Sequence, residues 1–240
     1  MTTSPTTISS GGVGVVVPAA GSGTRLGEPV PKAFVDIGGR TILEACVTGI
    51  RACGIASDVV VVVPAELVPR AAALVPDAIV VAGGDHRSES VRAGLEALPA
   101  RVDVVLIHDA ARALTPPVVF DRVIDAVRAG HPVVVPGLPV ADTLKRVGER
   151  LPDGSEPVAS TVDRESLRAI QTPQGFTRAA LRAAYANTSG LATDDAGLAE
   201  ACGIPVHVVD GDPLALKITT PWDLRIVREF IGVTSSEGQV

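Results

Sequence analysis

Short, continuously apolar runs alternate with helical patterns along this chain of 240 residues, and no other feature constrains its fold as strongly. Apolar runs without polar alternation are typical of strands that are covered on both faces of a sheet. Runs of this kind separated by helices form right-handed βαβ units, so the sequence predicts an α/β fold with a mostly parallel sheet flanked by helices. We expect strands at residues 13–18, 59–63, 78–81, 102–107, 132–135 and 206–209. We expect helices at residues 42–53, 66–74, 88–98, 117–129, 178–186, 194–201 and 221–230.

Composition and charge limit the number of domains and the kinds of binding partner that we expect for this chain. Without an internal repeat or linker, the sequence predicts one Rossmann-like domain at residues 13–233, between disordered polar tails at residues 1–12 and 234–240. The net charge is −6 and basic residues are not clustered, so we expect no nucleic-acid partner. No apolar run approaches the roughly 18 residues of a membrane span, and no signal peptide is visible. The three cysteines lack C-x-x-C spacing, which favours a reducing, cytoplasmic location.

One segment, residues 139–165, interrupts the alternation of strands and helices. Two stretches of alternating polar and apolar residues, 142–147 and 158–163, flank the turn signal Pro152-Asp153-Gly154, which predicts a β-hairpin. An isolated two-stranded hairpin is marginally stable in water. We therefore expect a projecting dimerisation arm that packs on a second copy of the chain, with a surface loop as the alternative.

A loop rich in glycine and proline follows the first predicted strand and reads P-A-A-G-S-G-T-R-L-G-E-P-V-P-K from Pro18 to Lys32. Successive backbone N–H groups in such a loop form a concavity for phosphate oxygens, and Arg25 and Lys32 add two cations. The third glycine of a dinucleotide fingerprint is missing, because Leu26 stands in its place, and no Gly-Lys-Ser/Thr of a P-loop follows. The loop therefore predicts a triphosphate site. An ordinary strand–loop connection is the alternative.

Polar and glycine residues also follow the third predicted strand, at the sheet edge where ligands bind in open α/β folds. Gly83 and Gly84 allow close backbone approach, while Asp85, Ser88 and Ser90 offer polar groups to a base or ribose. Capping of the next helix by Asp85 or Ser88 is the alternative.

Asp109 follows the most apolar predicted strand and is well placed to hold Mg²⁺, which prefers one or two carboxylates and completes its shell with water and phosphate oxygens. Arg112 would face a second anion. We expect the neighbouring His108 to be structural. Lys217 lies in an apolar run that predicts a strand, where it either binds an anion or extends its amine to water.

Seven motifs occur in order across the chain: V-V-P-A-A-G-x-G-x-R with a later P-K, G-G-D-x-R-x-x-S-V, H-D-A-A-R, D-T-x-K, T-V-D-R, T-P-Q and L-K-I-T. Together they resemble the 2-C-methyl-D-erythritol 4-phosphate cytidylyltransferase family. The resemblance implies a Mg²⁺-dependent reaction of CTP with methylerythritol phosphate, which gives the diphosphocytidyl product and pyrophosphate. It also implies a homodimer in which the hairpin arm embraces its partner.

The resemblance assigns roles to individual positions. Arg25 and Lys32 match the catalytic, charge-stabilising pair, and Asp109 matches the metal ligand. The residues that match the CTP site are Pro18, Ala19, Ala20, Gly21, Gly84, Asp85, Ser90 and Ala110. The residues that match the sugar-phosphate site are Arg112, Thr143, Arg164, Thr172 and Lys217, of which Thr143 and Arg164 would come from the other subunit.

Two other functions stay open at this point. A ribitol 5-phosphate cytidylyltransferase would share the loop and the base site and differ only in the sugar pocket. A catalytically silent nucleotide-binding module is a different class, but it has no need of Arg25, Lys32 and Asp109 together. An NAD-dependent oxidoreductase is disfavoured by Leu26 and by the prolines that follow the loop.

Overall fold

The computed structural model describes residues 11–21, 23–186 and 194–237. The strands are β1 Gly12–Pro18, β2 Asp58–Val63, β3 Ile79–Ala82, β4 Val102–Ile107, β5 Val133–Pro139, β6 Leu144–Val147, β7 Val158–Val162, β8 Arg168–Ile170, β9 Gln174–Thr177 and β10 Val206–Asp210. The α-helices are α1 Ile42–Ala52, α2 Val68–Leu74, α3 Arg87–Ala97, α4 Pro117–Arg128, α5 Arg178–Ala186, α6 Asp195–Ala201 and α7 Pro221–Glu237. Short 3₁₀ helices are η1 Thr24–Leu26, η2 Lys32–Phe34, η3 Ala65–Leu67 and η4 Pro213–Ala215.

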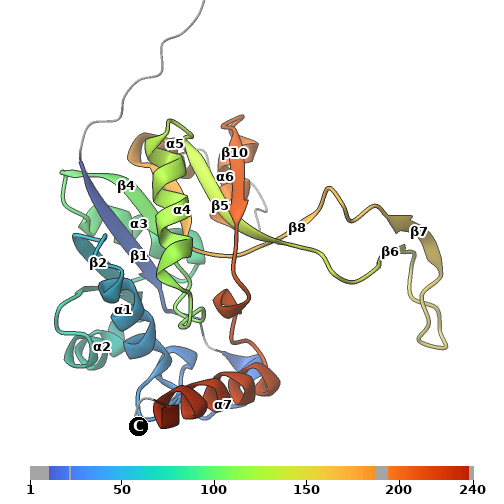
Figure 1. The fold of residues 1–240 in the computed structure, drawn as a ribbon, viewed down its shortest axis with the longest axis horizontal. Helices are drawn as coiled ribbons and strands as arrows, with labels where there is room; N and C mark the ends of the chain where they lie inside the picture. Colours follow the sequence, from blue (N-terminus) through green and yellow to red (C-terminus); the bar gives the residue numbers. More distant parts are fainter. Residues whose placement is uncertain (1–10, 22, 187–193, 238–240) are drawn as a thin grey trace, which may run out of the picture.

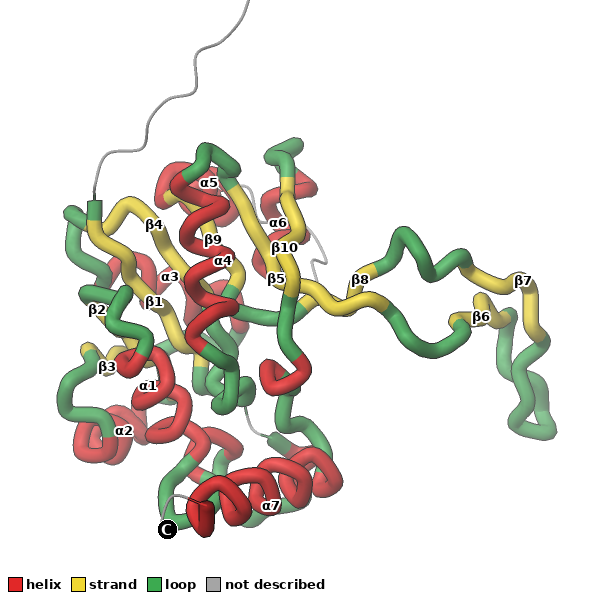
Figure 2. Tube along the Cα trace, viewed as in Figure 1, coloured by secondary structure: helices red, strands yellow, loops and turns green. Residues whose placement is uncertain are grey.

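The main sheet has eight strands in the order β10-β5-β9-β4-β1-β2-β3, and β8 pairs with β5 beside this path (Figures 1 and 2). Strand β9 runs antiparallel to β4 and β5, and β8 runs antiparallel to β5. The other described pairs in this sheet are parallel. The predicted α/β class with a mostly parallel sheet is confirmed.

Strand β1 lies inside the sheet and contributes to two hydrophobic clusters, one on each face. Val15 and Val17 pack into the cluster that contains α1 and α4, while Val16 packs into the cluster that contains α3, α5 and α6. All three valines are completely buried, which explains why this strand is continuously apolar.

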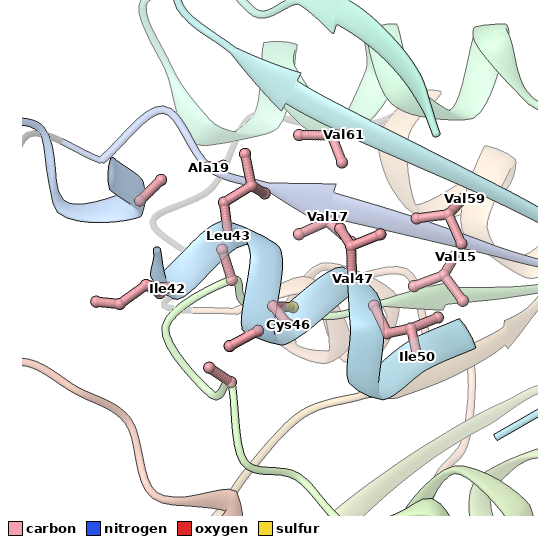
Figure 3. Packing of buried hydrophobic residues seen from close by; sticks show 14 of the residues in the cluster. Val15, Val17, Ala19, Ile42, Leu43, Cys46, Val47, Ile50, Val59 and Val61 are labelled. Atoms are coloured by element: carbon pink, nitrogen blue, oxygen red, sulfur yellow. The ribbon is translucent and has the colours of Figure 1, made fainter. Parts of the chain in front are cut away.

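Helix α1 shows how one face is covered (Figure 3). Its apolar stripe of Ile42, Leu43, Cys46, Val47 and Ile50 faces β1 and β2 and is buried. The helix begins at a capping box, in which the Thr41 hydroxyl accepts from the Glu44 N–H at 3.2 Å and the Glu44 carboxylate accepts from the Thr41 N–H at 2.8 Å. This packing holds the carboxyl ends of β1 and β2 in place.

The hairpin arm projects from the body of the domain (Figure 1). Its stem is the pair of β5 and β8, and its tip is the antiparallel pair of β6 and β7. The turn at residues 151–155 is closed by the Gly154 N–H, which donates to the Leu151 carbonyl at 2.9 Å. The expected hairpin is therefore present. Its apolar side chains remain exposed, with Val147 at 46% and Val158 at 60%.

The structure differs from the sequence prediction at the chain ends. Strand β1 already begins at Gly12. Helix α7 continues to Glu237, so the expected disordered tail is wrong for residues 234–237, which are helical. The expected tail residues 1–10 and 238–240 lie outside the described residues.

Strands β8 and β9 were not predicted, and the segment around Lys217 is a 3₁₀ turn followed by irregular backbone rather than a strand. Strand β9 carries polar and glycine residues for packing reasons. A side chain at Gly175 would clash with Val123 of α4, and the buried Gln174 amide donates to Asp194 at 2.7 Å and accepts from the Ala196 N–H at 3.0 Å. These residues hold α4 and α6 against the middle of the sheet.

Candidate active site

A cavity of about 660 Å³ opens at the carboxyl ends of β1, β2, β3 and β4. Among its lining residues are eleven that the sequence predicted: Pro18, Ala19, Ala20, Gly21, Lys32, Gly84, Asp85, Ser90, Asp109, Ala110 and Lys217. Gly83, which the sequence analysis expected at this edge, also lines it. Other lining residues had been given no role from the sequence, among them Pro64, Glu66 and Arg87. This is the edge at which open α/β sheets bind their ligands.

The loop after β1 folds back over Lys32 because it has glycine where other residues would not fit. Gly23 has a φ of 69°, and a Cβ there would lie 2.6 Å from the Lys32 Cβ. Leu26 is buried and anchors η1, whereas Arg25 is exposed and does not line the cavity in a single chain. The loop thereby brings Lys32 into the lining of the cavity together with Ala19, Ala20 and Gly21.

The segment after β3 forms the wall opposite this loop. A side chain at Gly83 would clash with the Ser90 hydroxyl, so glycine lets the backbone approach it closely. Ser90 is 1% exposed, lines the cavity, and its hydroxyl has no hydrogen-bond partner among the described residues. Buried polar groups are nearly always paired, and this hydroxyl at the cavity lining is therefore a candidate to hydrogen-bond a ligand there. The N-cap of α3 is His86 and not Asp85 or Ser88, which removes the capping alternative.

Asp109 lies among cations at the end of β4. Its Oδ2 is 2.7 Å from the Lys217 Nζ, and its Oδ1 is 3.6 Å from an Arg87 Nη2. Burial alone would raise the pKa of Asp109, but Lys217, Arg87 and Arg112 together hold it below its usual value. Burial and the charge of Lys217 lower the pKa of Lys32 to about 8. Lys32, Lys217 and Arg87 therefore lie near Asp109, in a cavity that is also lined by Glu66 and Asp85. The cations gathered around Asp109 suit a polyphosphate.

The backbone at Asp109 is fixed by Thr172. The Thr172 hydroxyl accepts from the Asp109 N–H at 3.0 Å and lies 3.1 Å from the Nδ1 of His108. His108 is buried against Phe120, and burial lowers its pKa to about 4. A neutral, enclosed imidazole agrees with the structural role that we expected for it.

Five predicted site residues lie outside the cavity wall of a single chain: Arg25, Arg112, Thr143, Arg164 and Thr172. Thr172 is buried behind Asp109, and Thr143 and Arg164 lie on the exposed arm. Arg112 donates to the carbonyls of Ala215 at 2.6 Å and Ile170 at 3.3 Å, so it ties the Lys217 segment to the stem of the arm.

The residues around Asp109 could hold a metal ion only if a bound nucleotide supplied further ligands. The described residues contain no group of three or more His, Cys, Asp or Glu side chains that could hold a metal by themselves. Mg²⁺ commonly uses one or two carboxylates and takes its remaining ligands from water and phosphates. The ionised Asp109 beside a phosphate-binding loop meets this requirement.

Fold and site together are those of a nucleotidyltransferase. The family model for 2-C-methyl-D-erythritol 4-phosphate cytidylyltransferase matches residues 13–232. The chain belongs to this family.

Among the described residues, no helix is long and apolar enough to cross a membrane.

Relatives and solved structures agree with this assignment. The chain is 53% identical over 224 residues to the 2-C-methyl-D-erythritol 4-phosphate cytidylyltransferase of Nocardia farcinica, covering 92% of this chain and 94% of the relative. It is 52% identical to the enzyme of the same name from Rhodococcus jostii, with coverages of 92% and 96%. The crystal structure of the Thermus thermophilus enzyme matches with a TM-score of 0.75 and 36% identity, covering 91% of this chain and 98% of that one. The 4-diphosphocytidyl-2C-methyl-D-erythritol synthase of Anaerococcus prevotii matches with a TM-score of 0.78, 26% identity, and coverages of 92% and 99%.

Proposed function

We propose that this chain transfers the cytidylyl group of CTP to 2-C-methyl-D-erythritol 4-phosphate, with Mg²⁺ as cofactor and with each active site shared between two chains. The product is 4-diphosphocytidyl-2-C-methyl-D-erythritol, an intermediate of isoprenoid biosynthesis, and pyrophosphate is released. The observation that carries the proposal is the position of Asp109 between Lys217 and Arg87, in a cavity that is also lined by Lys32 and by the start of the glycine-rich loop.

The charge distribution explains how the chain could catalyse this reaction. A phosphate oxygen of the acceptor forms a bond to the α-phosphorus of CTP, and the bond from that phosphorus to the bridging oxygen of pyrophosphate breaks. The nucleophile is already an anion, so no general base is required. The obstacles are repulsion between two anions and the charge that grows on the leaving pyrophosphate. Lys32 and Lys217, which line the cavity before the substrates bind, offset both.

Asp109 is the residue that would hold Mg²⁺, together with phosphate oxygens and water. The ion, when bound, would neutralise charge on the triphosphate. Arg25 is not in the cavity wall, and we propose that it approaches the leaving phosphates across the loop once CTP is bound.

The acceptor can be identified by a direct assay. Pyrophosphate release is measured with CTP and either 2-C-methyl-D-erythritol 4-phosphate or ribitol 5-phosphate, with Mg²⁺ or with EDTA. We expect turnover with the first acceptor and Mg²⁺ only. Preference for ribitol 5-phosphate would contradict the proposed substrate, and full activity in EDTA would contradict the proposed cofactor.

The arm supports a homodimer because the apolar side chains of its tip remain exposed in the described part of one chain. Strands β6 and β7 form a separate two-stranded sheet whose apolar side chains are exposed, and such a hairpin is marginal alone. We propose that a partner chain covers it and receives Thr143 and Arg164. The free thiols of Cys46, Cys53 and Cys202 suit the proposed cytoplasmic location.

Subunit complementation tests the shared site. Inactive Arg164→Ala and Lys32→Ala chains are mixed and allowed to exchange. In a mixed dimer one site collects both lesions, while the other keeps Lys32 and receives an intact Arg164. Statistical exchange makes about half of the dimers mixed, so roughly a quarter of wild-type activity should return. If mass analysis shows exchange and no activity returns, Arg164 acts within its own chain.

A further inference from the structure

Arg87 lines the cavity and lies between two carboxylates. One belongs to the buried Asp195, and the other to Asp109, which also lines the cavity. It is the first residue of α3, directly after the segment that follows β3. Its two terminal nitrogens, Nη1 and Nη2, donate to the two oxygens of Asp195, each at 2.6 Å. The same Nη2 lies 3.6 Å from the Oδ1 of Asp109.

Asp195 makes Arg87 a rigid group. The Asp195 side chain is completely buried in the first turn of α6, where it also accepts a hydrogen bond from the Tyr185 hydroxyl. A buried carboxylate must remain paired, and removal of one partner of a buried ion pair is strongly destabilising. Arg87 therefore cannot swing into the cavity without leaving this charge uncompensated. Consistent with this, its pairing with Asp195 raises the pKa of Arg87 in spite of burial.

Lys217 contacts the other oxygen of Asp109 in a different way. It lies in irregular backbone after η4, and its amine forms an ion pair with Asp109. A flexible ammonium of this kind can exchange partners when a metal or a phosphate arrives. The two oxygens of Asp109 thus have distinct neighbours: Oδ1 faces a fixed guanidinium and Oδ2 faces an exchangeable amine.

We propose that Arg87 is a positioning residue for Asp109. Anchored by Asp195, it fixes the rotation of the Asp109 carboxylate, so that Oδ2 remains directed at the position where the metal and the nucleotide phosphates bind. It acts through Asp109 and takes no part in bond making. Partners that orient a metal ligand typically change metal affinity or activity about 10- to 100-fold when they are removed. The inference rests on the proposed function, because it assigns Arg87 a role toward the proposed metal ligand.

The experiment measures CTP binding at equilibrium, once with Mn²⁺ and once with EDTA, in the absence of acceptor. The ratio of the two affinities is the gain that the metal confers. For Arg87→Gln we expect this gain to fall about 10-fold or more relative to wild type. Arg92→Gln is the matched control, since Arg92 is on the same helix and donates to the Tyr185 carbonyl at 2.9 Å but does not line the cavity. It should leave the gain unchanged.

Two further variants separate positioning from folding. Arg87→Gln/Asp195→Asn removes both charges of this ion pair, so no buried carboxylate is left unpaired, and it should fold while showing the same loss of gain. In an Asp109→Asn background, Arg87→Gln should change the gain by less than about twofold, because a residue that acts through Asp109 has no effect once Asp109 is neutral.

Three results would overturn the inference: an unchanged gain in both Arg87 variants, equal losses in Arg87→Gln and Arg92→Gln, or losses that multiply in the Asp109→Asn background. A wild-type chain with no metal-dependent gain would overturn it as well. Failure of the proposed function is recognised separately, because the wild-type chain would then release no pyrophosphate with CTP and the acceptor.

Discussion

Lys32 should make CTP binding sensitive to alkaline pH, since its amine is protonated only up to a pH of about 8 in the nucleotide-free chain. Burial is the main cause of this low pKa, followed by repulsion from Lys217, while Asp109 opposes the shift. The binding step needs the charged form, because a neutral amine does not attract a phosphate. The affinity for CTP should therefore be highest below pH 8 and fall above it.

The size of the effect follows from the pKa. If only the protonated form of Lys32 binds, the apparent dissociation constant is inversely proportional to the fraction of chains in which Lys32 is protonated. Between pH 7 and pH 9, CTP binding should weaken about tenfold, which corresponds to roughly 1.4 kcal/mol. The CTP phosphates are fully ionised over most of this range, so their own titration contributes little.

The assay is equilibrium binding of CTP in EDTA at a series of pH values, so that metal binding does not contribute. In Lys32→Arg the guanidinium stays charged, and the weakening between pH 7 and pH 9 should disappear. In Lys217→Gln the repulsion is gone, so the weakening should move to higher pH. The reasoning is refuted if Lys32→Arg retains the same alkaline loss, or if wild-type affinity is constant up to pH 10.

Three further predictions concern single positions. Asp109→Asn should lower the rate of pyrophosphate release at least about 100-fold with an unchanged circular dichroism spectrum, because the metal ligand and the counter-charge are lost together. Gly94→Ala should destabilise the chain by about 1–3 kcal/mol in urea unfolding, since the new methyl group would clash with Val16, whereas Gly232→Ala, which meets nothing within 4 Å, should stabilise it by up to about 1 kcal/mol. Thr172→Val should lower the free energy of unfolding by about 1–3 kcal/mol, because it leaves the Asp109 N–H unpaired. Thr172→Ser keeps the hydroxyl and should show the wild-type midpoint of urea unfolding.

The parallel part of the fold could be predicted because its strands are buried on both faces and consist of β-branched residues. Val15 to Val17 carry this pattern without interruption. Strand β9 does not, because Gln174 and Gly175 resemble loop residues until α4 and α6 are placed around them. These two residues form a strand because of their contacts with α4 and α6, and such contacts cannot be read from the local sequence.

The candidate site likewise has a part that could be predicted from the sequence and a part that could not. The loop glycines and the positions of Lys32 and Asp109 at strand ends could be predicted from local sequence, since strand ends are where such sheets bind ligands. Arg87 is the R of the G-G-D-x-R motif, and yet its position near Asp109 depends on Asp195, which is distant in sequence and fully buried. A local pattern does not show which carboxylate fixes an arginine.

Helix α7 carries the last described residues of the chain. It packs against η1, which lies in the loop after the first strand, β1. Arg228 of this helix donates to the Asp36 carbonyl at 2.8 Å, and Ile231 lies 3.0 Å from where a Cβ at Gly38 would be. A ribosome releases the first strands long before it releases α7, and domains begin to fold during synthesis. A nascent chain can therefore assemble β1, β2 and β4 while the loop still lacks its support. The proposed triphosphate site is completed only when synthesis reaches α7, so chains that stop before α7 would bind CTP poorly even if their sheet has formed.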